Sequence, residues 1–84
     1  MTDDEFNIID ELYFVTSFDD LKNSTELSDE KLKSNLIQMA KKGWVRVYKN
    51  VSEESEVESL DMNKDYQSFF YLASKKGLFE HNTQ

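Results

Sequence analysis

The 84-residue chain contains no cysteine, no proline, two glycines and a single histidine. Without cysteine it cannot form a disulfide framework, a thiolate metal site or a thiol nucleophile. The two glycines, Gly43 and Gly77, are too far apart to build a glycine-rich phosphate-binding loop. The single histidine, His81, is interpreted as a solvated residue or a helix C-cap contact. We therefore expect no enzymatic activity, no catalytic residue and no cofactor.

Long apolar runs are also missing from the sequence. No segment approaches the length that spans a bilayer, and the acidic N-terminus differs from the basic start of a signal peptide. We therefore expect a cytoplasmic protein that has no membrane partner. Hydrophobic residues make up 38% of the chain and charged residues 32%, which is a globular composition. Residues 1–84 are enough for one domain with a modest core.

The formal net charge is −7, and the acidic residues are unevenly distributed. Residues 1–16 carry five acids and no base, and residues 49–66 carry six acids against two lysines. Residues 17–48 carry five acids and six bases and are therefore nearly neutral. Both flanks of the chain are expected to repel anions.

Hydroxyl residues precede three segments whose apolar residues have helical spacing. Thr2, Ser17 and Ser28 are predicted N-caps, and Thr2 forms a capping box with Glu5. The helices that follow are expected to cover residues 3 to about 16, 18 to about 24, and 29–42. The predicted core consists of Ile9, Leu12, Leu21, Leu32, Leu36, Met39 and Trp44.

The segment AKKGWVRVYKN, residues 40–50, combines a helix stop with the start of a strand. Gly43 is predicted to end the third helix with a positive φ angle, because glycine takes the left-handed conformation at little cost. Apolar and polar residues then nearly alternate from Trp44 to Tyr48, which favours a strand over these residues.

The remaining segments complete an α+β pattern. Residues 49–66 are acidic and polar, and they are predicted to form a long hairpin loop. Residues 68–73 are rich in aromatic side chains and are predicted to be the returning strand. Ser74 is expected to cap a short helix from Lys75 to about His81.

The stretch FDDLKNSTELSDEKLKSNLIQMAKKGWVRV, residues 18–47, resembles the winged helix-turn-helix regulators of the multiple-antibiotic-resistance type. Residues 73–77 are similar to the Leu-Thr-x-x-Gly turn that follows the second wing strand in that family. The resemblance implies an α+β winged helix, in which a three-helix bundle carries a two- to three-stranded antiparallel wing and a short C-terminal helix. The positions in register with the family pattern are Leu21, Leu27, Ser28, Leu32, Leu36, Met39, Gly43, Trp44 and Val45.

The positions at which that family contacts DNA carry residues of both charges in this sequence. Asp29 and Glu30 begin the third helix, and acids close to the phosphate backbone oppose DNA binding. The expected wing carries Glu53, Glu54, Glu56 and Glu58. The candidate DNA-binding residues are Lys31, Lys33, Ser34, Gln38, Lys41, Lys42 and Arg46.

One acidic segment, Asp61-x-Asn63-x-Asp65, imitates the start of a calcium-binding loop. The sixth residue of such a loop is glycine and the twelfth is glutamate, but here these positions hold Tyr66 and Leu72. We therefore predict no metal site in this segment.

Aromatic residues are frequent, with six Phe, four Tyr and one Trp. Three consecutive aromatics in one strand point to both faces of the sheet, and interface cores are rich in such residues. The candidate protein-interface residues are Phe69, Phe70, Tyr71 and Phe79. Our first hypothesis is a non-enzymatic adaptor or regulatory module that binds a protein partner or a second copy. The alternative is a DNA-binding transcriptional regulator whose recognition helix is residues 28–42.

Overall fold

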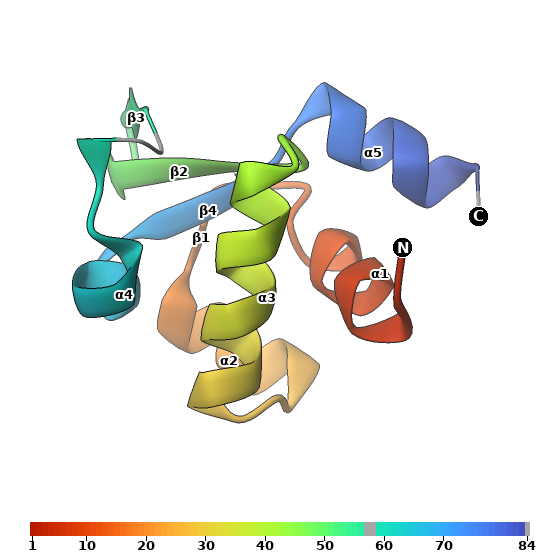
Figure 1. Ribbon diagram of the computed structural model, residues 1–84, viewed down its shortest axis with the longest axis horizontal. Coiled ribbons are helices and arrows are strands. Elements are labelled where there is room, and N and C mark those ends of the chain that lie inside the picture. The colour runs from red at the N-terminus through yellow and green to blue at the C-terminus, as the bar shows by residue number, and fades with distance from the viewer. Residues whose placement is uncertain (57–58, 84) are drawn as a thin grey trace.

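The computed structural model describes residues 1–56 and 59–83, and within these ranges the protein is an α+β molecule (Figure 1). Five α-helices and a short 3-10 helix accompany one four-stranded antiparallel sheet in this part of the chain. In chain order the elements are α1 (Asp3–Asp10), β1 (Thr16–Ser17), α2 (Phe18–Thr25), α3 (Asp29–Lys41), β2 (Val45–Asn50), β3 (Glu53–Ser55), α4 (Met62–Asp65), η2 (Tyr66–Ser68), β4 (Phe70–Ala73) and α5 (Lys75–Asn82).

The predicted helix caps are confirmed. At the first cap, the Thr2 hydroxyl accepts a hydrogen bond from the Glu5 N–H at 3.1 Å, and the Thr2 N–H donates to the Glu5 carboxylate at 2.8 Å. This reciprocal pair is the capping box, which satisfies two backbone donors that the helix leaves without partners. The same role is filled at the other predicted starts by Ser17, Ser28 and Ser74.

The first helix is shorter than predicted. It ends at Asp10 rather than near residue 16, and Thr16 and Ser17 form strand β1 instead. The reason is tertiary, since the Leu12 carbonyl accepts a hydrogen bond from the Ala73 N–H at 2.9 Å and is lost to the helix. Pairing with β4 therefore takes precedence over the helical spacing of the apolar residues.

The sheet has the strand order β1-β4-β2-β3, so that β4 lies between β1 and β2. Side chains alternate across a strand, and the register gives each face its own set of residues. Val45, Val47, Tyr71 and Ala73 point to the buried face. The helices α1, α2 and α3 lie together below β2 and β4 in the view of Figure 1.

The prediction of one long loop over the acidic segment 49–66 is wrong, because this segment contains the end of β2, strand β3 and helix α4. Strand β2 continues to Asn50, and a tight turn leads into β3, where the Asn50 side chain accepts a hydrogen bond from the Ser52 N–H at 3.0 Å. Further along, the Asp61 side chain accepts from the Lys64 N–H and so begins helix α4. Local side-chain-to-backbone hydrogen bonds give this polar segment structure. Residues 57 and 58, which include Glu58, lie outside the described residues.

Gly43 ends α3 as predicted, with a φ angle of +79°. The Gly43 N–H donates to the Ala40 carbonyl at 3.1 Å, and the Trp44 N–H donates to the Met39 carbonyl at 2.9 Å. These two bonds define a Schellman motif, which satisfies the last carbonyls of a helix.

Helix α5 is attached to this same corner. The Ser74 hydroxyl donates to the Gly43 carbonyl, and the Ser74 N–H donates to the Trp44 carbonyl at 2.9 Å. Gly77 lies so close to Trp44 that a Cβ atom at this position would overlap the Trp44 carbonyl oxygen. The end of α3 and the start of α5 are therefore packed backbone against backbone.

The predicted core is confirmed except at Trp44. That indole is only partly buried at the edge of the core, and the Lys42 ammonium lies 4.6 Å from its ring centroid. At this corner between α3 and β2 the ring packs against the apolar cluster but keeps part of its surface exposed. The fully buried predicted residues are Ile9, Leu12, Leu21, Leu32, Leu36 and Met39.

Candidate functional site

Helix α3 presents one polar face to solvent. Lys31, Ser34, Gln38 and Lys41 are exposed on it, as is Glu30. These positions lie opposite the buried stripe of the helix, as the 3.6-residue period requires. Four predicted DNA-contacting residues therefore share one accessible surface, which carries two lysines and one glutamate.

One flank of α3 is in contact with the segment that follows the wing. The Lys33 ammonium lies 5.1 Å from the ring centroid of Tyr66, and this ring meets Phe18 edge-to-face with centroids 5.0 Å apart. The Gln67 amide donates a hydrogen bond to the Asp29 carboxylate at 2.8 Å. Segment α4–η2 therefore restricts access to α3 from this side, and Lys33 is engaged within the molecule.

Asp29 also receives the Lys22 ammonium, which ties α2 to the first turn of α3. The hydrogen bond from Lys22 lowers the pKa of Asp29, and the same contact raises the pKa of Lys22. The acid at the start of the predicted recognition helix is thus paired with cationic and amide donors of the chain itself.

Lys42, another predicted DNA contact, is paired with a buried carboxylate. Its ammonium lies 2.9 Å from the Glu5 carboxylate, which is almost completely enclosed. Burial acts to raise the pKa of Glu5, but hydrogen bonds from Thr2 and Lys42 together lower it below the ordinary value. This ion pair joins α1 to the end of α3.

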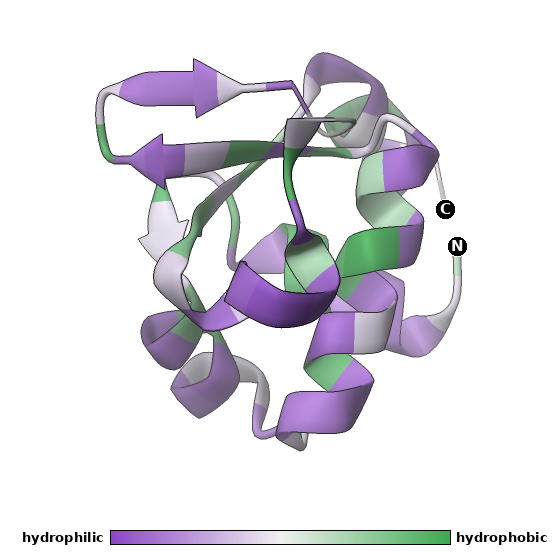
Figure 2. Ribbon diagram, turned by 60° about the vertical axis from the view of Figure 1, so that its left-hand side comes forward, coloured by the Kyte–Doolittle hydropathy of each residue, from purple (hydrophilic) through white to green (hydrophobic). Residues whose placement is uncertain are grey.

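Arg46 leans toward the acidic wing. Its guanidinium lies 3.8 Å from the Glu54 carboxylate, and both side chains are about half exposed, at 46% and 48%. Strand β3 and the adjoining end of β2 are hydrophilic (Figure 2), and Glu53, Glu54 and Glu56 are all exposed there. The described part of the wing is therefore acidic.

The predicted aromatic interface is wrong for two of its four residues. Phe69 is 7% exposed and Tyr71 is fully buried in the core. The Tyr71 hydroxyl donates to the Tyr66 carbonyl at 2.7 Å, so its polar end is satisfied inside the protein, and burial raises the pKa of this phenol. Phe79 is 67% exposed on α5, and Phe70 is partly exposed on β4.

Phe70 belongs to a set of side chains on the side of the sheet away from the core. In the strand register Tyr48 lies opposite both Phe70 and Glu54, and Arg46 lies opposite Leu72. Each of these side chains keeps part of its surface accessible. We refer to this set as the outer sheet face, and it consists of Ser17, Arg46, Tyr48, Glu54, Phe70 and Leu72.

The sequence prediction missed Tyr48 and Leu72 as surface residues. The signal that could have found them is the alternation within each strand, because Val45 and Val47 face inward and so Tyr48 must face outward. The same count from the buried Tyr71 places Leu72 on the outer face.

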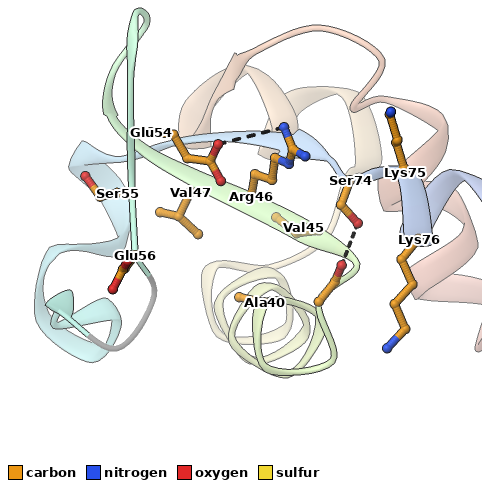
Figure 3. A pocket seen from close by; sticks show the side chains of 11 residues that line it. Ala40, Val45, Arg46, Val47, Glu54, Ser55, Glu56, Ser74, Lys75 and Lys76 are labelled. Atoms are coloured by element: carbon orange, nitrogen blue, oxygen red, sulfur yellow. Dashed lines mark hydrogen bonds and ion pairs between the residues drawn. The ribbon is translucent and has the colours of Figure 1, made fainter.

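A cleft of about 390 Å³ lies beside the corner between α3 and β2 (Figure 3). Glu54 and Glu56 stand on one side of it, and Lys75 and Lys76 on the opposite side. Val45 is among the apolar residues between these walls. The lining residues include carboxylates, ammonium groups and serine hydroxyls, but no imidazole or thiol. The cleft therefore has a negatively charged wall and a positively charged wall that face each other.

His81 is buried, so the first of the two sequence interpretations, a solvated residue, is wrong. Its ring stacks on Phe6 with centroids 4.0 Å apart, and Nε2 lies 2.9 Å from the Asp10 carboxylate. The imidazole thus serves to fasten α5 to α1.

The calcium-like residues have a local structural role. Asp61 caps α4 through the Lys64 N–H, and Asn63 and Asp65 belong to that short helix. Within residues 1–56 and 59–83, no three His, Asp or Glu side chains are grouped in a way that would hold a metal ion. None of the helices that the structure describes is long and apolar enough to cross a bilayer.

Comparison of the chain with protein-family models, with curated proteins and with solved structures gives no match.

Proposed function

We propose that this chain is a small winged-helix module that acts through protein contacts and has no catalytic activity. The winged-helix assignment is supported by the order of its elements. Three helices precede strand β2, a polar wing follows, and β4 returns beside β2 before the short helix α5. The left-handed Gly43 before β2 and the Ser74 cap after β4 add to this support.

The observation that carries the proposal is the accessible outer sheet face. Tyr48 and Phe70 lie opposite each other in the register, and Leu72 follows on the same face of β4. All three are partly exposed, although their size and apolar character favour burial. Two aromatic rings and a leucine grouped in this way match the composition of protein-interface cores.

The charges of helix α3 and of the wing favour protein contacts over DNA contacts. Lys33 and Lys42 are engaged by Tyr66 and Glu5 respectively, and Arg46 lies beside Glu54 of the acidic wing. Phosphate neutralisation supplies most of the non-specific affinity for DNA, and exposed wing glutamates would repel the backbone.

The alternative function is a DNA-binding regulator, and one observation favours it. Lys31, Ser34, Gln38 and Lys41 form an accessible surface on α3, where lysines can contact phosphates and the polar side chains can reach base edges. The two functions use different sides of the molecule, which allows a direct test.

A photo-crosslinking residue placed at Phe70 or, in a separate variant, at Ser34 distinguishes the two functions in cells that express the chain. We expect protein adducts from the Phe70 position and none with DNA from Ser34. DNA adducts from Ser34, together with nanomolar binding of a defined duplex at about 0.15 M salt, would replace our proposal with the regulator. Replacing Glu53, Glu54 and Glu56 with glutamine should strengthen any residual DNA binding, because it removes repulsion at the wing.

A further inference from the structure

We infer that the partner of the outer sheet face is the same face of a second copy of this chain, so that the protein forms a two-fold symmetric dimer. This inference rests on the protein-contact function proposed above and adds the identity of the partner. It is carried by the distribution of charge and apolar surface on that face.

The outer sheet face has no net charge although the chain is strongly acidic. Its charged members are Arg46 and Glu54, one of each sign, while Tyr48, Phe70 and Leu72 form its apolar part. A strongly basic or strongly acidic partner would therefore find few matching charges on this face. A neutral face with one cation and one anion is complementary to itself.

Two-fold symmetry uses this arrangement directly. In such an interface, if one residue contacts a second residue of the other copy, the reverse contact also occurs. Arg46 of each copy can then meet Glu54 of the other close to the two-fold axis, while the aromatic rings pack on either side of it. Within one chain the two groups are 3.8 Å apart and about half exposed. Such a loose surface pair contributes little stability, so both side chains are free to reorient.

The acidic surface of helix α1 does not prevent this pairing. Strands β2 and β4 separate the outer sheet face from the layer of helices below them, where α1 lies (Figure 1). At physiological salt, charges more than about 8 Å apart are largely screened. The dominant local interactions are those of the apolar side chains and of Arg46 with Glu54.

Sedimentation velocity of the purified chain at about 0.15 M salt tests the inference, since that salt concentration sets the screening length used above. We expect a species of twice the 9.9 kDa chain mass, with a monomer–dimer equilibrium in the micromolar range. Phe70→Glu should weaken the dimer at least tenfold. The matched control is Phe14→Glu, which changes an exposed phenylalanine in the bend before β1, outside the outer sheet face. Far-ultraviolet circular dichroism establishes that both variants are folded.

A charge exchange tests the symmetry itself. Arg46→Glu and Glu54→Arg should each weaken the dimer, because each places like charges opposite one another twice. An equimolar mixture of the two variants should dimerise again, because both cross-pairs then have opposite signs. A double variant carrying both changes should also recover the dimer.

Several results would overturn the inference. They are a wild-type chain that stays monomeric at several hundred micromolar, a dimer that Phe70→Glu leaves intact, or a mixture of the charge variants that stays monomeric. If the wild type is monomeric while crosslinking from Phe70 still captures a protein in cells, the second copy is excluded and the protein-contact function remains. If neither is observed, both proposals fail.

Discussion

Replacing Gly77 with alanine should destabilise the protein, although alanine is the better helix former. At an ordinary helix position this change stabilises by about 1 kcal/mol. Here the added Cβ would overlap the Trp44 carbonyl oxygen and come within 3.0 Å of its carbonyl carbon. Both atoms belong to backbone at the corner between α3 and β2, so neither can rotate away as a side chain would.

The expected magnitude follows from these opposing terms. Inserting a methyl group into a closely packed site costs about 1–3 kcal/mol, and contact with fixed backbone places Gly77→Ala near the upper end. To relieve the overlap, α5 must move away, which weakens the hydrogen bonds that Ser74 makes to Gly43 and Trp44. After the helix propensity is subtracted, the net loss is about 2 kcal/mol. For a domain of this size, that corresponds to a fall in Tm of roughly 8–16 °C.

Urea denaturation followed by the fluorescence of the single tryptophan measures this loss directly, because Trp44 lies at the site of the overlap. Lys76→Ala is the matched control, since it changes an exposed residue in the same helical turn and should alter stability by less than about 0.5 kcal/mol. A Gly77→Ala protein as stable as the wild type, or more stable, would refute the close approach of α5 to the corner.

Three further changes test other parts of the fold. Gly43→Val should lower the free energy of unfolding by about 1 kcal/mol or more, because valine resists a positive φ angle; an unchanged Tm would contradict this. Leu36→Ala should cost about 2–5 kcal/mol in urea denaturation, since this side chain is fully buried, and a loss below 1 kcal/mol would contradict its core position. The pKa of Glu5 is lowered on folding, so its contribution is present above the ordinary carboxyl pKa and is lost as the pH falls through the folded value. Denaturation at several acidic pH values should therefore show a smaller fall in stability for Glu5→Gln than for the wild type, and identical slopes would contradict the shift.

The parts of the fold that local chemistry determines were predictable from the sequence. Hydroxyl side chains before segments of helically spaced apolar residues marked the helix starts at Thr2, Ser17, Ser28 and Ser74. An N-cap depends only on its hydrogen bond to the first turn of the helix that follows. The positive φ angle of Gly43 was predictable for the same reason, because a glycine that follows the last turn of a helix ends it without help from distant residues.

The parts that depend on distant contacts were not predictable. The end of α1 is set by the bond between Leu12 and Ala73, two residues far apart in the sequence. The position of the acidic segment's helical turns against α2 and α3 depends on Tyr66, which packs on Phe18 of α2 and lies below the Lys33 ammonium of α3.

The candidate site was predictable only in part. Consecutive aromatics correctly indicated that one ring leaves the core, but the strand register, in which Tyr71 lies opposite the buried Val47, decides which ring it is. The lysines of the third helix could be proposed as DNA contacts from the sequence. Their partners in the folded chain, Tyr66 for Lys33 and Glu5 for Lys42, are far away in the sequence and are seen only in the structure.

The strand order has a consequence for the way in which the chain reaches its folded state. Strand β4 lies between β1 and β2, yet it follows both in the sequence, and its Tyr71 pairs with Thr16 on one side and Val47 on the other. Such non-local pairing requires long loops to close before any contact offsets their entropy, and this slows folding. Until residues 70–73 leave the ribosome, β2 has an open edge whose backbone donors and acceptors can pair with another chain. The risk of aggregation through this edge therefore lasts until β4 takes its place between β1 and β2.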